Sequence, residues 1–518
     1  MTRTETHGVC IRHTELPGAS RLFQDFLYHF PKVSSYFHHD PSSPDSLPNA
    51  LQAIEYPDTR RAQVAAALAQ INPPSQNLRL FAQSGTAAVL TGQQVGLYGG
   101  PAYTLYKALS AIALAKQLTA QGQPTVPIFW LATEDHDVEE IRSAHLWDQT
   151  VTAQAASDTR PAGLHELAGL PETALFGPEI QALADRHYRN GRTFGASFLG
   201  LLQELLSPLG LLFADPLHPA LRAAGADFLS KAAAAAPGLS DALVERGQSL
   251  ERNGYHAQVF FDPKQTSLLF RFEGDHRQQL KFDGHTYTNG KQSWTPAELA
   301  QQGAQLSPNA LLRPVWQDWL FPTVALYGGP GELAYFAQSE VLYRELLGRM
   351  PVMLPRSFFT IVDAKSESIL NRFRLHYQDV LRDEEQVRAA ISQRLIPPPL
   401  LATLEESEQR IERAFRDLDT QLAQFDPTLV ATSANSQSKV KYQFQKNKAK
   451  IVREVLRKND QAQRQAEHLS HRLAPHGHLQ ERHYCLLSML DAYGLDFIPT
   501  ILDNIHSDCH DHHVLVLG

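Results

Sequence analysis

Cysteine is scarce in this 518-residue chain, which contains only Cys10, Cys485 and Cys509. Three unevenly spaced cysteines exclude a fold that depends on a disulfide framework, because such frameworks use paired cysteines at much higher density. Unpaired thiols are typical of a reducing compartment. We therefore expect a cytoplasmic protein.

Long apolar runs are absent as well. No stretch of about 18 apolar residues, the length that crosses a bilayer as a helix, occurs in the sequence, and residues 1–30 lack the basic start and apolar core of an export signal. Basic residues are also in deficit, since 47 Lys and Arg stand against 55 Asp and Glu, a formal net charge of −8. We expect no membrane segment and no nucleic-acid partner, because phosphate backbones require a basic face.

The apolar residues that are present lie in short segments. Hydrophobic residues make up 43% of the chain, enough for a large core and for two or three structural units. Helical sequence separates four short apolar segments that we predict to be buried strands: residues 87–90, 126–132, 209–214 and 323–327. Strands that alternate with helices indicate an α/β fold with a parallel sheet.

These patterns divide the chain into four regions. Residues 1–85 are predicted to be an N-terminal helical region of the core, and residues 86–378 the α/β core itself. Short apolar segments separated by turn residues predict an antiparallel insertion near residues 258–305. Residues 379–470 are predicted to form a helical arm, and residues 471–518 a C-terminal segment that returns to the core.

The arm is predicted from an apolar stripe with helical spacing. Apolar residues recur at intervals of three, four and seven between Leu404 and Phe425, and Asp426-Pro427 then interrupts the helix. A second helix with a similar stripe, from Val440 to Val455, would return antiparallel to the first. We expect a long helical hairpin that is suited to pairing two subunits.

The first candidate binding segment follows the strand at residues 87–90. Residues 91–94 read Thr-Gly-Gln-Gln, and residues 97–101 read Leu-Tyr-Gly-Gly-Pro. Glycines such as Gly99 and Gly100 let the backbone approach a ligand closely, and a helix that begins at Pro101 would direct unpaired N–H groups at an anion. The alternative is that the Gly-Gly-Pro stretch only makes a tight turn between strand and helix.

Two side chains of the helix that follows, Thr104 and Lys107, are three residues apart and therefore share one face. A hydroxyl and an ammonium group placed there could contact the same phosphate or carboxylate.

The Leu-Tyr-Gly-Gly-Pro stretch occurs a second time, at residues 326–330, again between a predicted strand and a predicted helix. Gly328 and Gly329 would form this second loop, and Glu332 would lie on the helix that follows. In open α/β sheets, ligands bind in the crevice at the carboxyl ends of the strands. Two such loops in one sheet therefore predict that both border one binding crevice.

Four polar residues, Glu134, Asp135, His136 and Asp137, follow the predicted strand at residues 126–132. Groups at the exit of a buried strand could bind an amine or a metal, or accept a proton from a nucleophilic amine. The alternative is a solvated loop that caps the next helix, whose start favours carboxylates.

Arg313 and Arg356 lie at predicted element boundaries, where either guanidinium could hold a carboxylate by two hydrogen bonds. A structural salt bridge is the alternative for each. The Cys-His-Asp-His-His run at residues 509–513 has the residue types of metal ligands but lacks the paired spacing of a structural zinc site. We assign no metal ligands.

Taken in order, these motifs resemble the BshC family, the cysteine ligases of bacillithiol biosynthesis. The resemblance rests on Thr91 to Gln94 with Gly99, Gly100 and Lys107, on Phe129-Trp130 with residues 134–137, and on Leu312-Arg313-Pro314 with residues 328–332. Gly477 and residues 480–482 are similar too. The match extends over nearly the whole chain.

The resemblance implies a Rossmann-like core with inserted connecting segments and a coiled-coil arm that forms a homodimer. It also implies a ligase that joins the carboxyl group of cysteine to the glucosamine amine of glucosaminyl-malate, the last step of bacillithiol formation. A carboxylate needs activation before it forms an amide, so ATP or another nucleotide is expected. The Gly-x-x-x-x-Gly-Lys-Ser/Thr motif is nevertheless absent, as are His-x-Gly-His and Lys-Met-Ser-Lys-Ser patterns.

Roles follow from motif position and chemistry. The candidate catalytic residues are Asp135, His136 and Asp137, with His136 preferred as proton acceptor because imidazole ordinarily titrates near neutral pH. The candidate binding residues are Thr91, Gly92, Gln93, Gln94, Gly99, Gly100, Thr104, Lys107, Glu134, Arg313, Gly328, Gly329, Glu332 and Arg356. Two other functions stay open: a nucleotidylyltransferase-like enzyme acting on another small substrate, and a non-catalytic pathway scaffold.

Overall fold

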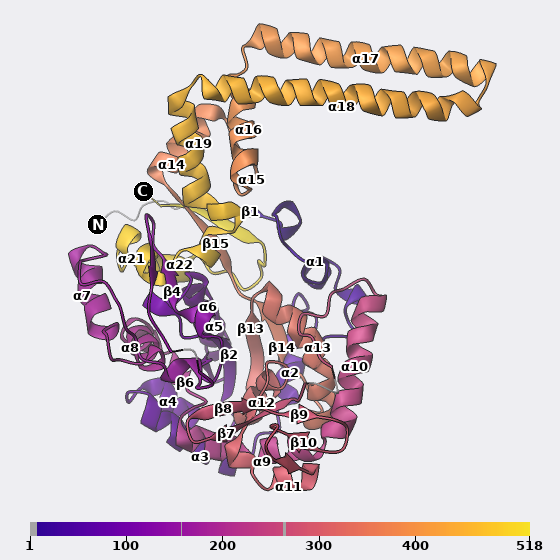
Figure 1. The fold of residues 1–518 in the computed structure, drawn as a ribbon. Helices are drawn as coiled ribbons and strands as arrows, with labels where there is room; N and C mark the ends of the chain where they lie inside the picture. The colour runs from indigo at the N-terminus through magenta and orange to yellow at the C-terminus, as the bar shows by residue number, and fades with distance from the viewer. Residues whose placement is uncertain (1–7, 157, 263–265, 518) are drawn as a thin grey trace.

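A five-stranded parallel sheet forms the centre of the protein. The computed structural model describes residues 8–156, 158–262 and 266–517, and Figure 1 shows a rounded body from which a helical hairpin projects. The sheet has the order β14-β13-β2-β3-β6, and all neighbouring strands run parallel. Its strands are β2 (Ala87–Gln93), β3 (Thr125–Leu131), β6 (Leu212–Ala214), β13 (Thr323–Gly328) and β14 (Val352–Pro355). The predicted parallel α/β sheet is confirmed.

The strands are apolar over nearly their whole length because helices cover both faces of the sheet. Alternate residues of β3 face opposite layers. Trp130 packs edge-on against Trp316 of α12 (Arg313–Leu320), whereas the neighbouring Phe129 packs against Phe198 of α8 (Phe194–Leu206). The Trp130 face belongs to one hydrophobic cluster, whereas the opposite face is shared by the cluster around Phe129 and a smaller one around Val89 and Val324.

The helices divide between these clusters. The Trp130 side contains α1 (Arg21–Tyr28), α3 (Asp58–Ile71), α4 (Gln76–Phe81), α9 (Pro219–Ala234), α10 (Ala236–Arg252), α12 and α13 (Pro330–Leu347). The Phe129 side contains α5 (Tyr103–Ala120), α7 (Pro178–His187) and α8. A short helix, α2 (Ser46–Gln52), packs against β13 and β14. Helix α5 begins at Tyr103, so the prediction that Pro101 is its first residue is wrong.

The insertion after α10 is antiparallel, as predicted. One small sheet has the order β12-β7-β8 and a second the order β11-β10-β9. The strands are β7 (Leu269–Glu273), β8 (His276–Gln279), β9 (Lys281–Phe282), β10 (Tyr287–Thr288), β11 (Ser293–Trp294) and β12 (Leu306–Pro308), with α11 (Pro296–Ala300) between the last two. A further pair, β4 (Ser143–His145) and β5 (Thr150–Thr152), follows the short helix α6 (Val138–Ile141).

A second sheet, which the sequence did not predict, lies beside the first. Its order is β1-β16-β15, with β1 (Gly8–Ile11) antiparallel and β15 (Phe358–Asp363) parallel to β16 (His512–Leu517). Only Arg356 and Ser357 separate β14 of the first sheet from β15 of the second. Helices α14 (Ala364–Phe373) and α19 (Asp460–Leu473) cover this sheet.

The arm consists of α17 (Pro398–Phe425) and α18 (Thr428–Arg457), which run side by side and project from the body in Figure 1. The predicted break at Asp426-Pro427 lies between them. The long helices begin at Pro398, later than the predicted start of the arm at residue 379. The residues between form α15 (Tyr377–Val380) and α16 (Glu384–Leu395), which pack near α19 at the base of the arm.

After α19 the chain returns to the body. Helices α20 (Gln480–His483), α21 (Leu486–Tyr493) and α22 (Phe497–Asp503) contact β15, α7 and α5 respectively. Within the described residues, no helix is both long and apolar enough to cross a membrane.

Close packing between α9 and α12 depends on Gly225. The indole Nε1 of Trp316 donates to the Gly225 carbonyl oxygen at 3.2 Å, and a Cβ at position 225 would collide with the indole ring. Trp316 is fully buried and has little room to move.

We predict that Gly225→Ala lowers the free energy of unfolding by about 1–3 kcal/mol through overpacking. The matched control is Gly247→Ala in α10, where a Cβ meets no atom within 4 Å. That substitution should be neutral or stabilising by up to about 1 kcal/mol, because alanine favours a helix over glycine. Urea unfolding of both variants checks this, and equal effects would contradict it.

Candidate functional site

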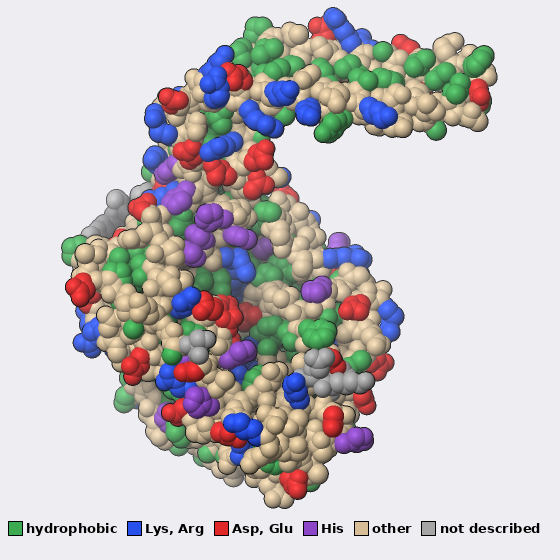
Figure 2. Space-filling view, in the orientation of Figure 1, with side chains coloured by type: hydrophobic (Ala, Val, Ile, Leu, Met, Phe, Trp, Pro, Cys, Tyr) green, Lys and Arg blue, Asp and Glu red, His purple; other side chains and the backbone are tan. Residues whose placement is uncertain are grey.

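A cleft of about 590 Å³ lies at the carboxyl ends of the parallel strands. Figure 2 shows a hollow at the centre of the body in which acidic and basic side chains meet. Segments after β2, β3, β13 and β14 line one side, and the antiparallel insertion contributes Phe270 and Arg277 on the other. The structure brings these predicted residues together in it: Gly92, Gln93, Gln94, Lys107, Glu134, Asp135, His136, Arg313, Gly329, Glu332 and Arg356.

The remaining predicted residues lie outside the cleft lining. Thr91 is fully buried and donates to the Tyr327 carbonyl oxygen at 3.2 Å, which ties β2 to β13. Thr104 is also fully buried, and its hydroxyl has no hydrogen-bond partner among the described residues. Thr104 and Lys107 therefore do not reach the same ligand, because the hydroxyl points into the protein.

The first Gly-Gly-Pro stretch is structural. Gly99 and Gly100 have φ angles of 86° and 65°, and a Cβ on Gly99 would lie 2.9 Å from the Cβ of Leu486 in α21. The stretch is packed under α8 and α21, away from the cleft lining. The prediction that both loops border the crevice is wrong for this one.

Gly92, and not the first Gly-Gly-Pro stretch, occupies the position on β2 that corresponds to the Gly-Gly-Pro loop after β13. Leu90 of β2 pairs with Leu326 of β13, so two residues further on Gly92 lies level with Gly328. Gly328 is itself covered by Phe336 and Glu332, whereas Gly329 lines the cleft. The two Gly-Gly-Pro stretches therefore have the same sequence but occupy different positions relative to the sheet.

Asp137 is the N-cap of α6. Its carboxylate accepts a hydrogen bond from the Glu140 backbone N–H at 3.1 Å, and it does not line the cleft. The capping alternative therefore accounts for Asp137, and the structure does not place this predicted catalytic residue in the cleft.

Lys107 lies at the back of the cleft among oxygen atoms. Its ammonium group forms an ion pair with Glu332 and donates to the Gly92 carbonyl at 3.0 Å and to Gln93 Oε1 at 2.9 Å. Burial lowers the pKa of Lys107, and the Glu332 carboxylate opposes that shift. Glu332 also accepts from the Gly329 N–H at 2.8 Å, so the protein's own carboxylate occupies the start of α13.

Arg356 is buried in an ion pair. It donates to Glu481 at 2.6 Å, and the two side chains are 1% and 0% exposed. Its guanidinium also lies over the Tyr103 and Phe358 rings, at 5.0 and 4.2 Å from their centroids. The structural alternative therefore accounts for Arg356, although part of it reaches the cleft.

Three other arginines line the cleft without a carboxylate ion-pair partner among the described residues. Arg277 is buried and donates to Ser307 Oγ at 2.9 Å and to the Pro308 carbonyl oxygen at 2.7 Å. Arg313 donates to Gln317 Oε1 at 2.9 Å and to the Tyr335 hydroxyl at 2.5 Å, both neutral groups. Arg482 is exposed, and its guanidinium lies 5.8 Å from the Tyr103 ring centroid. Arg313 and Arg482 are the cations best placed to meet an incoming anion.

Acidic groups gather across from them. Asp135 Oδ1 accepts from the His136 backbone N–H at 2.7 Å and lies 3.5 Å from His136 Nδ1. Gln94 donates to both Asp135, at 3.1 Å, and Glu140, at 2.5 Å. The His136 side chain is 66% exposed and tilts over Phe270, whereas that of Asp135 is 32% exposed. Burial raises the pKa of Glu140, and the charges of Asp135 and Asp137 add to this rise.

Glu134 belongs to the wall of the cleft. It forms an ion pair with Arg222 and accepts from the Ser307 hydroxyl at 3.1 Å. Burial raises the pKa of Glu134, whereas the nearby Arg222 and Arg277 lower it. These contacts tie the end of β3 to the insertion.

Sequence reasoning missed Arg482, Tyr103 and Glu140 as lining residues. The sequence signal for Arg482 was its place in the Gln-Glu-Arg run at residues 480–482. In the structure, the first two residues of this run bind the edge of β15. Gln480 exchanges hydrogen bonds with the Ile361 backbone at 2.8 and 2.9 Å, and Glu481 accepts from the Phe359 N–H at 2.9 Å. This anchoring directs Arg482 into the cleft.

Histidines border the cleft next to Arg482. His483 stacks on His145 with ring centroids 4.2 Å apart, and His476 lies 5.2 Å from His483. Burial lowers the pKa of His483 to about 4, and the neighbouring histidines, His145 first, lower it further. Burial also lowers the pKa of His145, so His483 and His145 stack as neutral rings at neutral pH.

A parallel sheet with a charged cleft at its carboxyl ends, joined to a helical hairpin, defines a Rossmann-like enzyme with a coiled-coil domain. Residues 9–357 match the N-terminal Rossmann-like domain of the bacillithiol biosynthesis protein BshC, and residues 359–517 match its C-terminal coiled-coil domain. The chain belongs to the BshC family, and the predicted resemblance is confirmed.

Curated relatives carry the name "Putative cysteine ligase BshC". The protein from Solibacter usitatus is 41% identical over 524 residues, covering 99% of this chain and 100% of the relative. That from Koribacter versatilis is 32% identical over 540 residues, covering 98% and 99%. That from Symbiobacterium thermophilum is 29% identical over 492 residues, covering 86% and 88%. The chain is therefore an enzyme from a family of ligases.

Proposed function

We propose that this protein joins the carboxyl group of cysteine to the glucosamine amine of glucosaminyl-malate, the last step of bacillithiol formation. The family and the name of its relatives support the class of reaction. The observation that carries the substrate assignment is the lining of the cleft, which holds Asp135 and His136 together with arginines that have no carboxylate ion-pair partner among the described residues.

The acidic edge suits the amine. An amine attacks an acyl group only as the free base, so an ammonium substrate must first lose a proton. His136 Nδ1 lies beside Asp135, and an imidazole oriented by a carboxylate is a common proton acceptor. Asp135 would hold the ammonium form and His136 would take its proton.

The arginines suit the malate part of the substrate. Malate presents two carboxylates, and guanidinium groups bind carboxylates through paired hydrogen bonds. Arg313 is fixed by Gln317 and Tyr335, both neutral, and has no carboxylate ion-pair partner among the described residues. Arg313 would hold one of the two carboxylates.

A nucleotide also fits the charge of the cleft. Arg482 offers positive charge and the neighbouring Tyr103 an aromatic face, whereas Glu332 already fills the start of α13. A phosphate would thus be held by side chains and not by a glycine-rich loop. When bound, ATP or another nucleotide would supply the activation that makes the cysteine carboxylate an acyl donor.

We also propose that the protein is a cytoplasmic homodimer that pairs through the arm. Large apolar side chains are exposed on both helices, with Leu418 46%, Phe425 83%, Val440 41% and Tyr442 63% exposed. Exposed apolar stripes on a projecting hairpin favour association with a second hairpin.

Substitution at the acidic edge tests the reaction. We expect His136→Ala and Asp135→Ala each to lower kcat by about 10²–10⁴-fold, the usual loss for a general base. The purified protein is incubated with cysteine, glucosaminyl-malate and ATP, and bacillithiol is measured by mass spectrometry. Asp137→Ala is the matched control, because this carboxylate only caps α6, and it should retain activity.

Full activity of His136→Ala and Asp135→Ala would contradict the assigned roles. Absence of product from the wild-type protein, with normal bacillithiol in a deletion strain, would contradict the reaction itself. Absence of product from the purified protein, with accumulated glucosaminyl-malate in the deletion strain, would support the scaffold alternative.

The malate contact gives a second prediction. Arg313→Gln should raise KM for glucosaminyl-malate by about 10–100-fold and leave kcat within a few-fold, because a charged hydrogen bond contributes about 1.5–3 kcal/mol. An analogue in which the malate carboxylates are methyl esters should lose this dependence on Arg313. Steady-state kinetics with both substrates separate the outcomes, and an equal effect on the diester would exclude the contact.

The arm gives a third prediction. The wild-type protein should sediment as a dimer, and a Leu418→Glu, Val440→Glu double variant should sediment as a monomer, because each charge would be buried in the pairing surface. Arg410→Ala, which removes an exposed intrahelical ion pair on α17, is the control and should remain dimeric. Monomeric wild-type protein in sedimentation velocity would contradict the proposal.

A further inference from the structure

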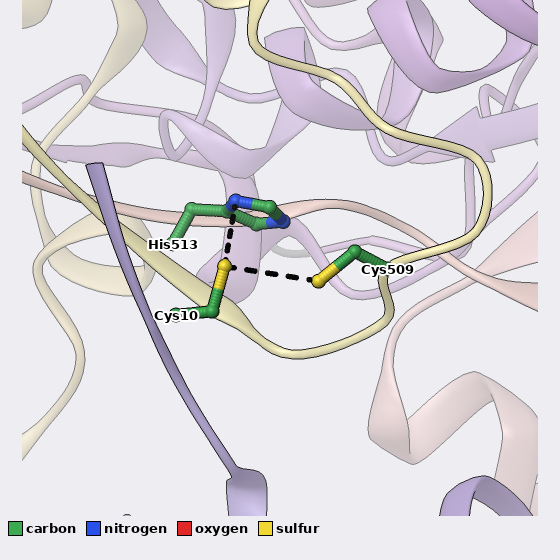
Figure 3. A group of neighbouring side chains, drawn as sticks. All are labelled: Cys10, Cys509 and His513. Atoms are coloured by element: carbon green, nitrogen blue, oxygen red, sulfur yellow. Dashed lines mark hydrogen bonds between the residues drawn. The ribbon is translucent and has the colours of Figure 1, made fainter. Parts of the chain in front are cut away.

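Two cysteines and a histidine from opposite ends of the chain meet on the second sheet. Cys10 lies in β1 directly opposite His513 in β16, and Cys509 lies in the turn that precedes β16. Figure 3 shows the three side chains pointing toward one another. They are separate from the cleft, and the proposed ligation uses none of them.

The two distances from Cys10 to the other groups match a tetrahedral zinc site. Zinc bonds sulfur at about 2.3 Å and nitrogen at about 2.0–2.1 Å, which places two sulfurs about 3.8 Å apart and a sulfur and a nitrogen about 3.5 Å apart. Cys10 Sγ is 3.8 Å from Cys509 Sγ and 3.6 Å from His513 Nδ1. All three atoms lie within 4.8 Å of one another.

The orientation of His513 adds to this match. Its ring is buried, its Nε2 has no hydrogen-bond partner among the described residues, and its Nδ1 lies 3.6 Å from the Cys10 sulfur. A hydrogen bond with the Cys509 backbone also holds the ring at this place. A thiol hydrogen bond alone is weak. A shared cation would give all three groups a strong partner.

We propose that Cys10, Cys509 and His513 bind one zinc ion. Two thiolates and a neutral imidazole are a soft ligand set that favours zinc over magnesium or calcium. Each thiol would release its proton to solvent on binding, and the two thiolate charges would balance the charge of the ion. Cys10 is exposed, so water can complete the tetrahedron.

The site would fasten β1 to the sheet. This strand has four residues and pairs only with β16 at the sheet edge, and short terminal strands are readily lost unless they are tied down. Zinc would bind the folded arrangement and stabilise it, because the ligands are about 500 residues apart in the unfolded chain.

Metal analysis tests the proposal on the full chain. After purification under reducing conditions with added zinc and removal of the excess, we expect about one zinc per chain for the wild type and background values for Cys10→Ser and Cys509→Ser. Cys485→Ser is the matched control, because Cys485 lies outside the cluster, and it should retain the zinc. Cobalt should give a thiolate charge-transfer band in the wild type and control alone.

Thermal unfolding provides a readout that does not depend on enzyme activity. Zinc should raise Tm of the wild type and of Cys485→Ser but not of Cys10→Ser. The Cys10 side chain is exposed, so we expect this variant to retain the fold. Zinc content near background in the reduced wild type, or unchanged zinc in Cys10→Ser and Cys509→Ser, would overturn the proposal. Isolation of a Cys10–Cys509 disulfide that forms again with zinc present would overturn it too.

Discussion

The buried ion pair between Arg356 and Glu481 holds the two sheets together. Arg356 lies where the chain leaves β14 of the first sheet for β15 of the second, and Glu481 comes from the segment that returns after the arm. Removing one partner from a buried pair of this kind typically costs about 3–5 kcal/mol, because the other charge is left uncompensated. The glutamate also accepts the Phe359 N–H, so one carboxylate fixes both a side chain and a strand.

The shape of the cleft depends on this pair. Because α20 is anchored through Gln480 and Glu481, Arg482 emerges at the edge of the cleft beside Tyr103. Most other charges of the cleft are neutralised within the protein, as in the pair of Lys107 with Glu332. Arginines without a carboxylate ion-pair partner among the described residues and the acidic group Asp135 remain in the lining, and the proposed substrate, which carries an amine and carboxylates, would be oriented by them.

The sequence predicted the parallel sheet, the insertion and the hairpin because each depends on local patterns of apolar and turn residues. It did not predict the second sheet, because β1, β15 and β16 are separated by hundreds of residues and no local pattern pairs them. The first Gly-Gly-Pro stretch was misinterpreted for a related reason. Whether Gly99 faces a ligand or Leu486 depends on a helix far along the chain. Asp135 and Lys107 were found because each follows or faces a strand end that the sequence did reveal.

The route of the chain between the two sheets has a consequence for how the protein can be divided. The family boundary near residue 358 separates β15 from β14, yet β1 belongs to the second sheet, and α21 and α22 complete the hydrophobic cluster around α5. Neither half of the sequence is therefore a self-sufficient folding unit. Cutting the chain at that boundary would remove the edge strand β1 from the C-terminal part. It would also expose the residues of the N-terminal part that pack against Leu486, Leu487 and Phe497. The boundary between the two family domains is therefore not a place where the polypeptide can be divided into two stable pieces.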